Sequence, residues 1–158
     1  MTDQFLTTDS LSWNSFANRP TFIPAIANAT PSQMTWDFVE VQGANYYSTG
    51  PISEFGTSYD LLEPITYQIM GGTIADWHKQ METHLQNVTT QAPNYRYLVS
   101  QGTAHIVLNQ PSFYQYDVNG TSLRDWVAAL ANGQEVSSSQ CTGNDCMVQP
   151  TFASDAGP

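Results

Sequence analysis

His105 and Asp60 are the two residues of this chain whose type and setting could do acid–base chemistry together. His105 follows the strand-like run 95–100 and the short segment Gly102-Thr103-Ala104, and Asp60 follows an earlier strand-like run at 52–59. An acid at the end of one strand and a histidine at the end of the next is how a Ser-His-Asp hydrolase presents its general base and the carboxylate that orients it. The spacing therefore predicts an acid–base pair, with His105 as the base and Asp60 behind it.

The nucleophile that such a pair would serve has no counterpart in this sequence. No Gly-x-Ser-x-Gly or similar strand–serine–helix turn precedes Asp60. Ser58 and Ser100 are the serines nearest the expected strand ends, and neither has glycines on both sides. We therefore expect the chain to supply the acid and the base while the serine comes from another segment or a second polypeptide.

Each of these two residues also has a purely structural interpretation. Aspartate favours helix N-termini, so Asp60 could cap a helix. His105 could pack locally in its loop. Asp37, Asp76 and Asp117 are weaker candidates for the acid because none ends a strand before a helix.

We expect no metal and no cofactor. His78 and His84 are six residues apart, whereas a helical metal site needs a spacing of four, so a packed histidine is the favoured interpretation of His84. Asp117-Val118-Asn119-Gly120 resembles the start of a calcium loop, but the later ligands and the terminal glutamate are missing.

Charge excludes several classes of partner. The chain has 158 residues, a formal net charge of −10 and only four basic residues. Binding to a phosphate backbone requires clustered lysine and arginine, so we expect neither nucleic acid nor an anionic membrane surface as a partner. No stretch approaches the roughly 20 apolar residues of a membrane span, and the first residues lack the pattern of a signal peptide.

The cysteines and sequons favour an exported protein. Cys141 and Cys146 bracket the turn-forming Thr-Gly-Asn-Asp, which could bring the two sulfurs into a local disulfide. Three acceptor sequons begin at Asn28, Asn87 and Asn119. Together with the few charged residues, these features predict a secreted, extracellular glycoprotein.

Three regions are expected along the chain. Residues 1–34 contain three prolines among scattered aromatics and are expected to form an irregular wrapping segment. Residues 35–133 are expected to form an α/β core that carries the acid and the histidine. Residues 134–158 are expected to form a polar tail with the disulfide.

Within the core, patterning predicts strands alternating with helices. Residues 35–42 are ambiguous, and Glu63-Pro64 predicts a helix start that Gly71-Gly72 would end. A second helix carries an apolar stripe with spacings of four, four and three, and a third follows a capping box at residues 122–125 and ends at Asn132-Gly133. Such alternation predicts an α/β fold with a short parallel sheet. Since parallel sheets are normally buried on both faces, we expect a neighbour along one sheet edge.

The run 94–105, the segment Phe113-Tyr114, the run 119–127 and the Cys141–Cys146 tail together resemble the C-terminal part of pectin-acetylesterase-like serine hydrolases, a branch of the α/β-hydrolase superfamily. Tyr59-Asp60 and the following helix resemble the segment that carries the triad acid there. The resemblance covers about residues 50–146. It implies the C-terminal half of an α/β-hydrolase-like three-layer sandwich, with Asp60 and His105 as acid and base.

The function that follows as an expectation is a carboxylic ester hydrolase, or the subunit or cleaved portion that supplies its acid and base. The substrate would be a small acyl ester or an acetylated polysaccharide. A second polypeptide, or an N-terminal half, would supply the nucleophile serine and the rest of the sheet. The alternative is a non-catalytic extracellular binding or assembly module derived from a hydrolase.

Overall fold

The computed structural model describes residues 16–69 and 71–147. These residues divide into two compact units, one drawn from the described residues of the ranges 16–52 and 64–95 and the other from 53–63 and 96–147. The chain passes back and forth between these two units. The fold class is mixed, with helices and a small parallel sheet of three strands. In the ranges just given, no helix is both long and apolar enough to cross a bilayer.

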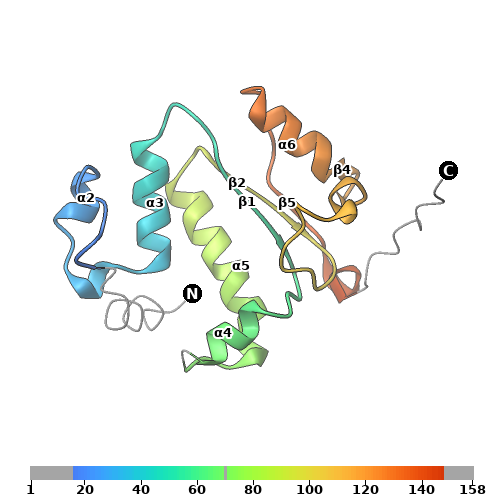
Figure 1. Ribbon diagram of the computed structural model, residues 1–158, viewed down its shortest axis with the longest axis horizontal. Coiled ribbons are helices and arrows are strands. Elements are labelled where there is room, and N and C mark those ends of the chain that lie inside the picture. Colours follow the sequence, from blue (N-terminus) through green and yellow to red (C-terminus); the bar gives the residue numbers. More distant parts are fainter. Residues whose placement is uncertain (1–15, 70, 148–158) are drawn as a thin grey trace. The chain divides into compact units, whose positions relative to one another are not determined.

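The first unit is helical (Figure 1). Its elements are α2 (Pro24–Ala27), the 3₁₀ helix η1 (Pro31–Gln33), α3 (Trp36–Tyr46), most of α4 (Glu63–Ile69), and α5 (Ile74–Gln91). Residues 16–34 thus contain two short helices within the segment expected to be irregular. The ambiguous run 35–42 belongs to α3, which begins where the Thr35 hydroxyl accepts a hydrogen bond from the Phe38 amide at 3.0 Å.

The stripe predicted for the second helix lies on α5, which packs against α3. Trp77, Leu85 and Val88 are buried there, and Met81 is half-buried. His84 is buried beside them, as the packed-histidine interpretation predicts. Ile65 and Ile69 share a face of α4, but both side chains are exposed to solvent rather than packed in the core. The unit therefore closes its core around α5.

The second unit carries the sheet. Its strand order is β1 (Ile52–Thr57), β2 (Tyr95–Ser100), β5 (Ser139–Gln140), with β2 and β5 parallel and Leu98 opposite Ser139. The segment expected as a polar tail therefore contributes a strand, since the Cys141 amide also donates to the Val99 carbonyl at 2.9 Å. β3 (Asp117–Val118) and β4 (Thr121–Ser122) form a hairpin whose turn residues Asn119 and Gly120 both have positive φ.

Helix α6 (Leu123–Ala131) closes the core of this unit. Ser122 caps it by accepting from the Asp125 amide, and Gly133 follows its end with φ of 68°. The Ser122 cap and the glycine after the helix agree with the prediction, whereas the Asp125 carboxylate, expected to complete a capping box, accepts from Nε of Arg124 at 2.8 Å. The remaining elements are the 3₁₀ helices η2 (Pro111–Tyr114) and η3 (Gly143–Met147). The buried core cluster consists of Leu98, Val107, Tyr116, Val118, Leu123 and Trp126.

The predicted disulfide joins Cys141 to Cys146, with the two Cα atoms 5.2 Å apart. The residues around Cys146 contact the segment before His105, because the Gly102 amide donates to the Cys146 carbonyl at 3.4 Å. The Cys141 amide is hydrogen-bonded to Val99 of β2. The loop closed by the disulfide therefore contacts both the sheet and the segment that begins at Gly102.

We expect the double variant Cys141→Ser/Cys146→Ser to lower the free energy of unfolding by about 2 kcal/mol, the loop-closure entropy of so short a ring. Urea titration followed by tryptophan fluorescence measures the difference, and reduction of the unaltered chain should reproduce it. Equal stability of the oxidised chain and the double variant would contradict a structural role for the bridge.

Candidate functional site: a His–Asp pair beside an apolar cavity

The segments after β1 and β2 run side by side within the second unit. The amides of Ser58, Tyr59 and Leu61 donate to the carbonyls of Ser100, Gly102 and Thr103 at 2.9, 3.0 and 3.3 Å. These bonds extend the pairing of the two strands beyond their ends. They bring the residues that follow β1 next to the residues that follow β2, as expected for neighbouring parallel strands.

Asp60 and His105 meet at this edge of the sheet. The Nδ1 atom of His105 lies 3.0 Å from Oδ2 of Asp60, which is a hydrogen bond donated by the ring. The Asp60 side chain is only 8% exposed, whereas the His105 side chain is 37% exposed. Within the part of the chain that the structure describes, Asp60 is the hydrogen-bonding partner of this ring, so Nε2 is the nitrogen left for a ligand or a reacting group.

The two oxygens of the Asp60 carboxylate have different hydrogen-bond partners. Its Oδ1 atom accepts hydrogen bonds from the amides of Leu62 at 2.7 Å and Glu63 at 2.9 Å, at the start of α4. Its Oδ2 atom is thereby turned toward His105. The helix-start interpretation and the acid interpretation are therefore compatible, because the helix start holds the carboxylate in the position that orients the ring.

Gly102 allows the chain to reach this position. Its φ is 100°, in the region that side-chain-bearing residues rarely adopt, and the residue is buried. The turn at Gly102 is held from both sides, since its carbonyl accepts from Tyr59 and its amide donates to Cys146. The short path from Gly102 to His105 is held by these backbone contacts and by the Thr57 hydroxyl, which donates to the Ala104 carbonyl at 2.9 Å.

Neither serine considered from the sequence is available to His105. Ser58 and Ser100 are 1% and 0% exposed. The Ser58 hydroxyl donates to the Ser100 carbonyl at 3.2 Å and lies 2.8 Å from Sγ of Cys141, and the Ser100 hydroxyl donates to Oε1 of Gln101 at 3.1 Å. Both hydroxyls serve the packing of the strand ends.

Three groups at the site have a spacing that a cation could bridge. One ligand atom each from Asp60, Glu63 and His105 lie within 4.8 Å of one another. A metal bound there would compete with the Asp60–His105 hydrogen bond if it used Nδ1. The expectation of no metal stays a prediction.

A cavity of about 360 Å³ adjoins the pair. Its wall contains His105 and Ser53 together with seven apolar residues, which are Phe55, Ile106, Val107, Leu108, Leu123, Trp126 and Val127. Three of these residues, Val107, Leu123 and Trp126, also belong to the buried core cluster. This cavity could not be predicted from the sequence, because its shape depends on how α6 packs against the strands.

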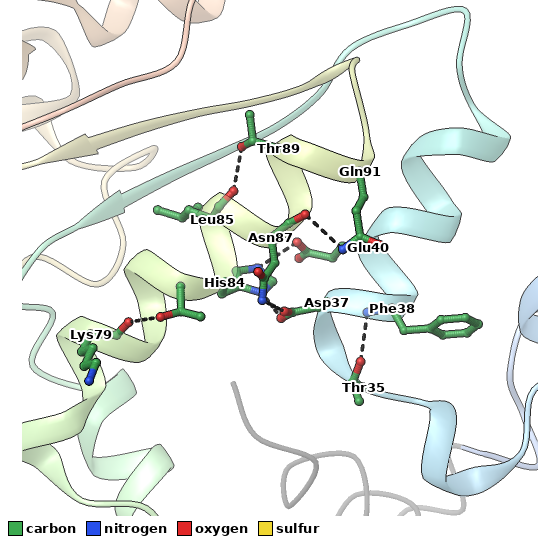
Figure 2. A network of polar contacts seen from close by, with 11 residues as sticks. Thr35, Asp37, Phe38, Glu40, Lys79, His84, Leu85, Asn87, Thr89 and Gln91 are labelled. Atoms are coloured by element: carbon green, nitrogen blue, oxygen red, sulfur yellow. Dashed lines mark hydrogen bonds and ion pairs between the residues drawn. The ribbon is translucent and has the colours of Figure 1, made fainter.

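A second polar cluster lies in the helical unit, between α3 and α5 (Figure 2). The Nδ1 atom of His84 lies 2.5 Å from Oδ1 of Asp37, and its Nε2 atom lies 3.0 Å from Oε2 of Glu40. Asn87 donates to the other Asp37 oxygen at 2.8 Å. Both ring nitrogens face carboxylate oxygens, so when both carboxylates are ionised the ring donates one hydrogen bond to each and links the two helices.

Sequence reasoning missed this cluster, although a signal was present. Asp37 and Glu40 are three residues apart on one helix, and His84 and Asn87 are three apart on the other, so each pair shares a helix face. What the sequence did not show is that these two faces meet. From the sequence alone, Asp37 is only a weak candidate for the catalytic acid.

The pKa of Asp37 is lower than its ordinary value. Burial raises it, but the hydrogen bonds from His84 and Asn87 and the charge of His84 outweigh burial. A carboxyl group whose pKa falls on folding contributes stability above its unfolded pKa, near 4, and that contribution is lost as pH falls through the lowered folded value.

We therefore expect Asp37→Asn to destabilise the protein at pH 7 by more than it does at pH 3. Chemical denaturation at the two pH values measures the difference, with Asp145→Asn, at an exposed carboxylate outside the cluster, as the control. A penalty of equal size at both pH values would contradict a charge-based role for Asp37.

Comparisons of this chain with protein-family models, with curated proteins and with solved structures find no match.

Proposed function

We propose that this chain is the part of a serine carboxylic ester hydrolase that supplies its acid and its base. The observation that carries the proposal is the hydrogen bond from His105 to Asp60, in which a buried, doubly anchored carboxylate orients a half-exposed imidazole. This is the arrangement that leaves Nε2 unprotonated and able to accept a proton. The resemblance of residues 50–146 to pectin-acetylesterase-like hydrolases supports the same assignment.

In the proposed reaction, Nε2 of His105 takes the proton of a serine hydroxyl as the serine oxygen attacks the ester carbonyl. The tetrahedral intermediate collapses when the imidazolium returns this proton to the leaving alcohol, and an acyl-serine remains. Water then attacks the acyl group, again giving its proton to Nε2. The imidazolium returns the proton to the serine oxygen as the carboxylic acid leaves.

The serine in this proposal belongs to a second polypeptide or to an N-terminal half of the same protein. Support comes from the two buried serines at the strand ends, which are committed to packing, and from β1, which forms an edge of the described sheet. A companion that pairs with an edge strand would extend the sheet into a larger three-layer sandwich. Secretion, and a substrate class of small acyl esters or acetylated polysaccharides, belong to the same proposal.

The test is to treat native material with a fluorophosphonate and to map the labelled residue by mass spectrometry. We expect a labelled serine on a companion polypeptide that co-purifies with this chain, and no label on the separated 17.5 kDa chain. Hydrolysis of short acyl esters should disappear in step with labelling.

The second candidate is a non-catalytic binding or assembly module that retained the hydrolase architecture. The burial of Ser58 and Ser100 favours this candidate, because neither serine can reach a substrate. A binding module needs no nucleophile, so their burial would not impair its function. Absence of any labelled serine and of ester turnover in native material would decide for this candidate.

A further inference from the structure

The cavity beside His105 lies within the second unit, and the proposed chemistry at His105 does not by itself say which group the cavity binds. It has about 360 Å³ of space, which places it near the lower end of the range for small-molecule sites. An acetyl group has a single methyl beyond its carbonyl and would fill only a small part of it. The size of the cavity therefore argues for a larger group.

The side chains of the cavity wall indicate which kind of ligand could bind there. Seven of its residues are apolar, and the polar side chains that reach it are those of Ser53 and His105. Among the residues that the structure describes, no carboxylate lines it, although the chain as a whole carries a net charge of −10. A neutral hydrocarbon group fits such a wall, whereas a charged or multiply hydroxylated group would lose hydrogen bonds to water without replacement.

The position of His105 gives the cavity a polar end. The ring belongs to the wall, and its Nδ1 atom is already held by Asp60. A ligand with one polar group attached to a hydrocarbon chain can place the polar group near this ring and the chain against Ile106, Leu108 and Trp126. This is the shape of an ester of a straight-chain fatty acid.

We infer that this cavity binds the hydrocarbon part of a straight-chain acyl group of about four to eight carbons, with the acyl carbonyl toward His105. The inference rests on the proposed function for the identity of the ligand as an ester. It departs from acetyl esters as the preferred substrate, and it assigns the choice of acyl chain to residues that follow His105 and to α6.

Binding can be measured without turnover by using hexanamide and acetamide as probes, since these amides are uncharged analogues of the two acyl groups. Each methylene that is fully buried strengthens binding about fourfold. Because the cavity is partly open, we expect hexanamide to bind the native protein at least about tenfold more tightly than acetamide. Titration followed by ¹H–¹⁵N NMR should shift the His105 ring, the Trp126 indole and the amides of residues 106–108.

Two variants make the test specific to the cavity. Ser53 is exposed on β1 and lies on the cavity wall, so Ser53→Trp should fill the space and abolish the hexanamide shifts. Gln134→Trp places the same side chain at an exposed position that is not part of the wall and should leave them unchanged. If Ser53→Trp fails to fold, Leu108→Ala removes a 76% exposed wall residue and should weaken hexanamide binding severalfold.

Equal affinity for the two amides, or undiminished binding after Ser53→Trp or Leu108→Ala, would overturn the inference. Its failure is separable from failure of the proposed function. If native material hydrolyses esters through His105 but shows no preference for hexanamide, the acyl-chain inference alone is wrong. If hexanamide binds as expected while ester turnover is independent of His105, the cavity is an apolar ligand site and the hydrolase proposal is wrong.

Discussion

Ester turnover by the native assembly should fall by at least about 10⁴-fold when His105 is replaced by alanine. The reason is that Nε2 of His105 is the proposed acceptor of the serine proton and the donor to the leaving alcohol, so both steps lose their proton carrier. The fold should survive, because the His105 side chain is 37% exposed and its hydrogen bond is to Asp60 alone among the described residues. Steady-state hydrolysis of short acyl esters, at matched melting temperature, measures the effect.

His78 provides the matched control for this substitution. It is a partly exposed histidine that pairs with Glu82 four residues later on α5, in the other unit. His78→Ala removes the same side chain and the same kind of carboxylate contact, and it should leave turnover unchanged. Added imidazole should restore part of the activity of His105→Ala by entering the space that the ring leaves. Undiminished turnover in His105→Ala would remove His105 from the mechanism.

The parts of the fold that could be predicted from the sequence are those governed by local rules. The cap at Ser122, the stop at Gly133 and the apolar stripe of α5 each depend on residues within a few positions of one another. The Cys141–Cys146 bridge is equally local, because the intervening turn brings the two ends together. All four features are confirmed.

The parts that could not be predicted depend on distant segments. α3 lacks a clear apolar stripe, since its buried residues are Val41 and Ala44 while polar side chains share its packed face with α5. β5 has only two residues of ordinary polar character, and it is a strand because β2 lies beside it. The role of Asp37 depends on a histidine 47 residues away.

The candidate site is an intermediate case. The proximity of Asp60 and His105 follows from a general property of parallel strands, whose carboxyl ends share one edge of the sheet. Which oxygen of Asp60 would face the ring, and that the other oxygen would hold the start of α4, could not be read from the sequence. The adjoining cavity could not be predicted from the sequence either, because it is defined by the packing of α6 and the loop 105–108.

Replacing Asp60 with asparagine should separate the orienting role of this residue from its structural role. Asparagine retains an oxygen that can accept from the amides of Leu62 and Glu63, so the start of α4 should be preserved. The group facing Nδ1 of His105 then becomes an NH₂ donor. The ring must accept at Nδ1 and carry its proton on Nε2, which is the tautomer that cannot take a proton from serine.

We therefore expect Asp60→Asn to lower the turnover number by about 10⁴-fold at neutral pH with little change in the free energy of unfolding. The ¹⁵N shifts of the His105 ring should report the change of tautomer, which a purely structural role of Asp60 would not produce. Asp117→Asn is the matched control, because Asp117 also holds a turn by accepting from a backbone amide, that of Gly120, at 2.7 Å. If Asp60→Asn altered stability but left both the tautomer and turnover as they were, Asp60 would be a helix-start residue only, and the base would have to be oriented by another group.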